Sequence, residues 1–234
     1  EYKTIPDRLY IGNAFCHLLF PKEEQLFALM EKAIVENVEI TLVFPCMREF
    51  QVEERGKLLK KVDNWCEKRQ TRVEILVNDW GMTALVKESG KHLEPCLGVL
   101  LNKQKKDPRM RYKKGSTRGL GESNLQADFY RTFLKDTYGI TRYEWESCGY
   151  PQVFPQGKNS LHLPYYQTNT SQYCPLYASC TEGERGKQRL PEHCPGYCEQ
   201  YAYLYPEHLH MAGRYNSLFG LDAELVKHPE KLKA

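Results

Sequence analysis

The 234-residue sequence lacks several features that mark familiar classes of protein. No apolar run approaches the roughly 18 residues of a membrane-spanning helix, and the mean hydropathy is −0.63. The chain opens without the basic and then apolar stretch of a secretory signal, so we expect a cytoplasmic protein. With 33 Lys and Arg against 30 Asp and Glu, the net charge of +3 is too small to indicate nucleic-acid binding. Neither a His-Glu-x-x-His zinc motif nor a recognisable Ser-His-Asp motif is present, which argues against a hydrolase.

What the sequence does contain is a regular alternation of strand-length apolar runs and helix-period stretches. At 41% hydrophobic and 27% charged residues, the chain can build a sizeable core. Helices are expected from Pro21 onward, over residues 52–65, and over residues 125–134 with an end at Gly139. Strands are expected at residues 8–12, 39–44, 72–77, 97–101, 141–145 and 160–167. Strands that recur about every 30 residues, with helices between them, indicate βα units and a parallel sheet.

These elements predict the α/β fold class. The chain length favours a (β/α) TIM-barrel-like domain, incomplete because six or seven strands are counted against the eight of a full barrel; a doubly wound sheet is the alternative. Residues 1–167 are expected to form this barrel-like core. Residues 168–234 are expected to form a cysteine-rich segment packed on the same domain, irregular in structure and ordered by a bound metal or cluster.

Cysteine is the most informative residue type. An odd number of cysteines in a chain with no visible export signal argues against a disulfide scaffold. Isolated cysteines are commonly small buried hydrophobes, and we favour that interpretation for Cys46, Cys66, Cys96 and Cys148. Cys16 follows the first expected strand, so we expect it at the carboxyl-end face of the sheet, where ligands bind in such folds.

The remaining four cysteines are clustered in the pattern Cys174-x5-Cys180-x13-Cys194-x3-Cys198. Four thiolates can hold one metal centre. The second pair has the spacing of a zinc knuckle, and His193 offers an imidazole to zinc, but the first pair is spaced more widely than zinc sites prefer. Iron–sulfur clusters accept irregular spacing, and two of these cysteines are followed directly by proline, as in ferredoxin-type runs. The pattern favours an iron–sulfur cluster, with zinc and no metal as alternatives.

Two polar residues, Asn78 and Asp79, come directly after the third expected strand. A carboxylate and an amide at the carboxyl end of a strand can bind substrate or move a proton. The same residues followed by Gly81 also fit a helix N-cap with a turn glycine. We regard Asn78 and Asp79 as catalytic candidates and keep the N-cap as the alternative.

A basic run covers residues 102–118, with eight basic residues and one acid. It follows the fourth expected strand, and it is either a solvated surface loop or an anion-binding segment at the carboxyl edge of the sheet. Arg109 and Arg118 are the candidates for substrate binding, by bidentate contact to a carboxylate. Tyr112 is the only aromatic residue in the run, which gives little support to single-stranded RNA as a partner.

Four segments together resemble the peptidase U32 family, whose better-understood members are iron–sulfur proteins. They are residues 9–16 (LYIGNAFC), residues 77–81 (VNDWG), residues 97–109 (LGVLLNKQKKDPR) and the cysteine-rich tail. The resemblance covers most of the chain and implies a barrel-like domain that carries a [4Fe-4S] cluster. Relatives take part in oxygen-independent hydroxylation, either of the aromatic ring of a quinone precursor, as a two-protein pair, or of a tRNA uridine.

The resemblance also implies a ligand set for the cluster. Cys16 matches a first-strand ligand, Cys194 and Cys198 match the closing pair, and either Cys174 or Cys180 is the remaining ligand. Five cysteines thus compete for four positions. We therefore expect a [4Fe-4S] protein of the U32 type with oxygen-independent hydroxylation or related redox chemistry on a small or aromatic, anionic substrate, and with a paralogous partner. The alternatives are a non-catalytic iron–sulfur or zinc-binding partner subunit, or a peptidase-like hydrolase.

Overall fold

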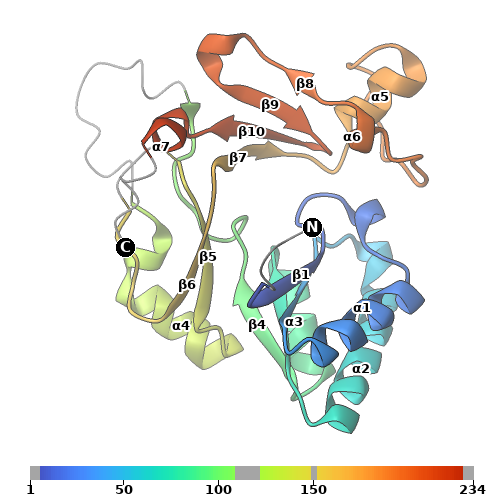
Figure 1. The fold of residues 1–234 in the computed structure, drawn as a ribbon, viewed down its shortest axis with the longest axis vertical. Coiled ribbons are helices and arrows are strands. Elements are labelled where there is room, and N and C mark those ends of the chain that lie inside the picture. Colours follow the sequence, from blue (N-terminus) through green and yellow to red (C-terminus); the bar gives the residue numbers. More distant parts are fainter. Residues whose placement is uncertain (1–5, 109–121, 149–151, 229–234) are drawn as a thin grey trace. The chain divides into compact units, whose positions relative to one another are not determined.

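The computed structural model describes residues 6–108, 122–148 and 152–228, and the chain divides into two compact units (Figure 1). Unit 1 contains Glu1–Leu101 and Asp128–Tyr143, and unit 2 contains Asn102–Ala127 and Glu144–Ala234. The division is not at residue 167, because the segment that follows β4 belongs with the C-terminal part of the chain.

A six-stranded sheet is the main element of the fold, with its strands in chain order β1-β2-β3-β4-β5-β6. The pairs from β1 to β5 are parallel. The strands are β1 (Arg8–Gly12), β2 (Glu39–Val43), β3 (Val73–Val77), β4 (Leu93–Leu97), β5 (Arg142–Glu146) and β6 (Lys158–His162). The predicted α/β class with a parallel sheet is confirmed, and the arrangement is compatible with a (β/α) barrel-like fold.

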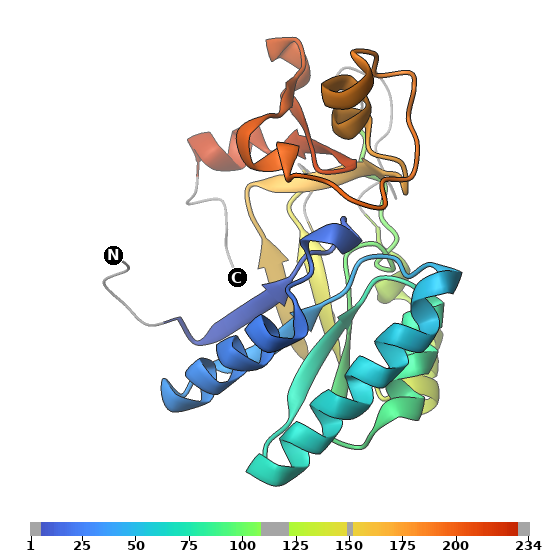
Figure 2. The same ribbon diagram turned by 90° about the vertical axis from the view of Figure 1, so that its right-hand side faces the viewer.

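The helices of unit 1 are α1 (Glu23–Val35), α2 (Val52–Arg69), α3 (Trp80–Ser89) and α4 (Asp128–Tyr138). Strands placed side by side in chain order, with right-handed crossovers, put the connecting helices on one face of the sheet. Figure 2 shows α1 and α2 together on that face. α1 buries Leu26, Met30 and Ala33, a spacing of four and then three residues that forms one helical stripe.

Unit 2 contains an antiparallel sheet with strand order β7-β10-β9-β8. These strands are β7 (Tyr165–Thr170), β8 (Tyr203–Leu204), β9 (Met211–Arg214) and β10 (Ser217–Leu221). The unit also contains α5 (Pro175–Glu182), α6 (Tyr197–Gln200) and α7 (Ala223–Lys227). α5 packs against α6, with the Tyr177 and Tyr197 ring centroids 6.2 Å apart (Figure 1).

Two strand predictions need correction. The apolar run 97–101 is not the fourth strand: β4 ends at Leu97, and Val99, Leu100 and Leu101 form a buried loop after it. The strand itself is Leu-Glu-Pro-Cys-Leu, whose charge and proline hide it from a search for apolar runs. The single strand expected at 160–167 is two strands, β6 and β7, in different sheets and separated by a cis Leu163–Pro164 peptide.

Two helix and tail predictions also need correction. In the helix predicted from the apolar periodicity of residues 125–134, Phe129 and Phe133 are 78% and 45% exposed, and Leu134 is the residue of α4 that is buried. The tail, expected to be irregular, contains the four-stranded sheet of unit 2. Its strands are short and rich in Tyr and Gly, so they lack the alternation that predicts a strand.

Among the residues that the structure describes, none of the helices combines the length and the apolar character needed to cross a membrane.

Candidate functional site

Asn78 lies at the carboxyl end of β3 and joins the segments that follow three strands. Its Nδ2 donates to the carbonyl of Phe44 at 2.9 Å, and its Oδ1 accepts from the backbone N–H of Leu100 at 3.3 Å. The side chain is almost completely buried. Both ends of the amide are therefore used to hold the loops after β2 and β4, which gives Asn78 a structural role.

Gly98 explains why the loop after β4 can approach Asn78 so closely. A Cβ atom at Gly98 would lie 2.2 Å from Asn78 Oδ1 and 2.8 Å from the carbonyl oxygen of Val77. Neither neighbour can give way, because Asn78 is fixed by its hydrogen bonds and the Val77 carbonyl accepts from the Gly98 N–H at 2.8 Å. The Leu-Gly pair at 97–98 is thus required by packing at the strand ends.

Asp79 is the N-cap of α3. One carboxylate oxygen accepts from the backbone N–H of Met82, and the other accepts from the N–H of Met47 in the loop after β2, both at 2.7 Å. This is the N-cap geometry that the sequence offered as the alternative for this position. The role of Asn78 and Asp79 in substrate positioning stays a prediction.

Replacing Asp79 by alanine is expected to lower the free energy of unfolding by about 1–3 kcal/mol, because two backbone N–H groups lose their acceptor. Asp79→Asn keeps one carbonyl oxygen for Met82 and is expected to lose less. Urea unfolding of the two variants beside the wild type measures the difference. A change within about 0.5 kcal/mol for Asp79→Ala, the range of an ordinary surface substitution, would contradict the capping role.

The loop after β1 holds Cys16, the candidate ligand in unit 1. Asn13 Oδ1 accepts from the N–H groups of Phe15 and Cys16 at 2.8 and 2.9 Å, which fixes the turn. Cys16 is half-buried and precedes a short 3₁₀ turn that begins at His17. Burial, with the positive charges of Arg48 and Arg55, lowers the pKa of His17 to about 4. The imidazole beside Cys16 is therefore neutral near pH 7.

Two further cysteines of unit 1, Cys46 and Cys66, have ordinary structural surroundings. Cys46 is half-buried, and its thiol donates to the carbonyl oxygen of Asn78 at 3.5 Å. Burial raises the pKa of the Cys66 thiol to about 12, so this group is not a thiolate under physiological conditions. All nine cysteines lie within the described residues, and each is a free thiol there.

The four tail cysteines all belong to unit 2 and lie on or beside the packed helices α5 and α6. Cys174 is the N-cap of α5, and its sulfur accepts from the N–H of Tyr177 at 3.4 Å. Cys180 lies within α5 and is exposed, whereas Cys198 lies within α6 and is buried. Cys194 is half-buried in the segment before α6. The Cys174 thiol also donates to the carbonyl oxygen of Tyr215 at 3.2 Å, so its sulfur has both a donor and an acceptor partner within unit 2.

The distances between the tail sulfurs can be compared with those that a zinc ion or an iron–sulfur cluster requires. Among the described residues of unit 2, no three of the four sulfurs lie within 4.8 Å of one another. A tetrahedral zinc ion with bonds of about 2.3 Å would bring its sulfur ligands to about 3.8 Å from one another. The corners of an iron–sulfur cluster hold their thiolates further apart. The choice of a cluster over zinc therefore rests on the cysteine pattern of the sequence and stays a prediction.

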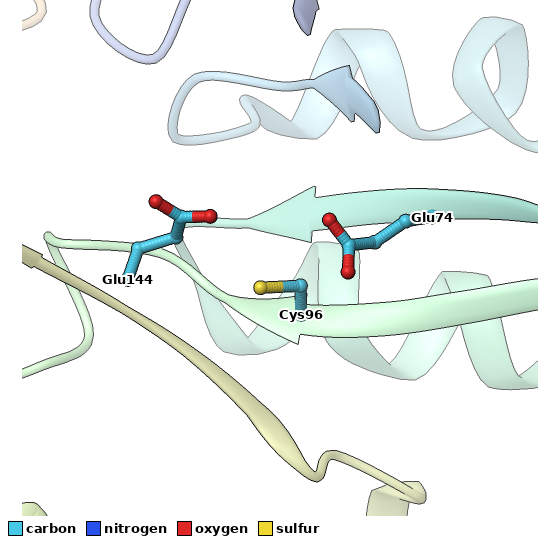
Figure 3. Close-up of side chains that lie close together, drawn as sticks. All are labelled: Glu74, Cys96 and Glu144. Carbon is cyan, nitrogen blue, oxygen red and sulfur yellow. The ribbon is translucent and has the colours of Figure 1, made fainter. Parts of the chain in front are cut away.

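A buried ionic network on the sheet of unit 1 was not found by sequence reasoning. Figure 3 shows the Glu74 carboxylate of β3 and the Cys96 thiol of β4, which share one face of the sheet. Glu74 accepts from Arg142 of β5 at 2.5 Å and from Arg8 of β1 at 3.2 Å. Thr41 of β2 donates to the same carboxylate at 2.7 Å. These side chains tie together four strands, β1, β2, β3 and β5, through one carboxylate.

Arg142 extends this network in two directions. Its Nη1 donates to the sulfur of Cys96 at 3.5 Å, and its Nη2 donates to the hydroxyl of Tyr10 at 2.9 Å. The side chains of Glu74 and Arg142 are each only 10% exposed. The sequence of β3, Val-Glu-Ile-Leu-Val, could have indicated this network. Strands of a parallel sheet are mostly apolar, so a charged residue within one marks a polar patch on the sheet.

Arg109 and Arg118, the residues expected to bind an anionic substrate, lie outside the described residues. Lys106 of the same basic run is described, and its ammonium lies 2.5 Å from the carboxylate of Glu146. The run therefore supplies at least one internal ion pair in unit 2.

The fold and these side chains define a mixed α/β protein with a parallel sheet and a thiol-rich segment. Comparison with protein-family models found no matching family, and no curated protein or solved structure matched the chain.

Proposed function

We propose that this chain is a [4Fe-4S] protein of the U32 type that takes part in oxygen-independent hydroxylation, or a related redox step, on a small or aromatic substrate. The candidate ligands in unit 2 are the thiolates of Cys174, Cys180, Cys194 and Cys198, and Cys16 of unit 1 is the fifth candidate for the four positions. The bound cluster would supply electron transfer at thiolate-held iron. The proposal rests on one observation, the gathering of four thiols on and beside two packed helices of the same unit.

Hydrogen bonds fix the positions of two of the tail cysteines. The N–H of Tyr177 hydrogen-bonds to the Cys174 sulfur, and hydrogen bonds to ligand sulfurs are one of the means by which a protein sets a cluster's potential. Arg214 donates to the backbone carbonyl of Cys198 at 2.9 Å, which fixes the backbone at the last cysteine. Burial of Cys198 would limit the access of water to its side of the centre.

The resemblance to U32 proteins supplies the reaction class and the partners within this proposal. A small anionic substrate is consistent with the basic run 102–118, and a paralogous U32-type subunit is the proposed protein partner. A second possibility is that the chain is a non-catalytic partner subunit whose thiols hold a cluster or zinc. Metal analysis, and activity assays of the chain together with its partner, distinguish this possibility from the first.

Iron, acid-labile sulfide and zinc content, measured on protein purified without oxygen, test the proposal. We expect about four iron and four sulfide per chain, with a broad visible absorption band that bleaches on reduction. Zinc at about one per chain without sulfide would contradict the redox function and leave a metal-stapled binding or hydrolytic domain. Protein reconstituted with iron and sulfide that still binds neither would contradict the metal centre itself.

A further inference from the structure

A second polar cluster lies in unit 2, at the carboxyl ends of β5 and β6, and the iron–sulfur proposal does not use it. Glu144 and Glu146 are two residues apart on β5 and therefore point to the same face of the sheet. His162 is the last residue of β6 and contacts Glu144, while Lys106 contacts Glu146. Carboxyl ends of parallel strands are where α/β folds bind and transform their ligands.

The two ion pairs of this cluster differ in their access to solvent. The side chains of Glu146 and Lys106 are only 5% and 11% exposed, so solvent has little access to this pair. The Glu144 side chain is completely buried, but the imidazole of His162 is 44% exposed. The Lys106–Glu146 pair has little contact with solvent. In the His162–Glu144 pair, the carboxylate is buried and the imidazole is partly exposed to solvent.

The position of Glu144 is fixed from the backbone. Asn102 Nδ2 donates to the Glu144 carbonyl at 2.9 Å, and the neighbouring N–H of Ser147 donates to the carbonyl of His162 at 3.1 Å. The contact between the carboxylate and the ring is made through Nε2 of His162. A buried carboxylate that holds one nitrogen of an exposed imidazole orients the ring and stabilises its charged form, as catalytic bases require.

We propose that His162 is a general acid–base residue for a ligand that is a weak oxygen acid, such as a phenol, an enol or a carboxylic acid, and that Glu144 is its positioning residue. In the forward step the O–H bond of the ligand breaks and an N–H bond forms on the imidazole. The electron pair of the O–H bond stays on the ligand oxygen, and the new imidazolium is stabilised by the Glu144 carboxylate. The step involves no oxidant or reductant and does not depend on the iron–sulfur cluster.

Binding of 4-nitrophenol, whose anion absorbs visible light, tests this proposal on the full chain. At a pH where the free probe is mostly protonated, we expect the wild type to bind it and to convert the bound probe to the coloured anion. His162→Gln is expected to bind at least about tenfold more weakly, the effect of one hydrogen bond to a charged group. Glu144→Gln is expected to bind the probe without forming the anion, because the imidazolium loses its carboxylate.

A matched control is a second histidine–carboxylate pair among the described residues, His92 with Asp63. Their side chains are 17% and 16% exposed, and His92 Nδ1 lies 3.1 Å from the Asp63 carboxylate. His92→Gln is expected to leave binding and colour unchanged. No binding by the wild type, or equal binding and colour in His162→Gln, would overturn the proposal. Circular dichroism of each variant checks that the fold is retained. The colour change of the probe bound to the wild type tests the proposal even if a variant fails to fold.

Discussion

Replacing Glu74 by glutamine is expected to lower the free energy of unfolding by about 3–5 kcal/mol. The carboxylate of Glu74 balances the guanidinium groups of Arg8 and Arg142 on the face of a buried sheet. Glutamine is nearly the same size but carries no charge, so the variant removes the carboxylate that Arg142, only 10% exposed, contacts. Removing one partner of a buried ion pair is among the largest effects that a single substitution can have.

Urea unfolding followed by circular dichroism measures this effect, and Glu94→Gln is its control. Glu94 lies directly opposite Glu74 in the register of β3 and β4, and it also pairs with an arginine, Arg72. Both side chains of that pair are more than half exposed, so its loss is expected to change stability by less than about 1 kcal/mol. Equal effects of the two variants would show that the Glu74 network does not brace the sheet.

Replacing Cys194 and Cys198 by serine is expected to remove most of the iron and sulfide from anaerobically prepared protein. Both residues lie in or just before α6, and serine offers an alkoxide that is a poor ligand for a cluster. The visible band should disappear with the metal. Iron, sulfide and absorbance per chain, measured after the same reconstitution, give the result.

Cys46→Ser is the matched control for the tail variants. Cys46 is also half-buried, and serine can keep the hydrogen bond to the Asn78 carbonyl. We expect its iron content to equal that of the wild type. The iron content of Cys16→Ser, measured in the same way, shows whether Cys16, the fifth candidate, is a ligand. Full iron content in the Cys194/Cys198 double variant would contradict the assignment of the tail as the metal centre.

The sequence predicted most of unit 1 because the relevant forces there act locally. Strands β1, β2 and β3 lie within a residue or so of their expected positions, and α1 begins two residues after Pro21, from which its helix was expected. β4 was misplaced because the apolar loop after it is buried for packing reasons, and loops of that kind carry the same pattern as a strand. The tail sheet was missed because its short strands depend on pairing with distant segments.

The candidate functional residues also differ in how far the sequence alone could identify them. The sequence by itself determined the α/β class with a parallel sheet and the clustering of four thiols within one segment, because these follow from periodicity and spacing. Only the tertiary structure decided that Asp79 caps α3 and that Glu74 holds two arginines, since those partners are remote in the chain. The same holds for His162 on the buried Glu144, because a contact between strands depends on register, and register is set by the packing of the whole sheet.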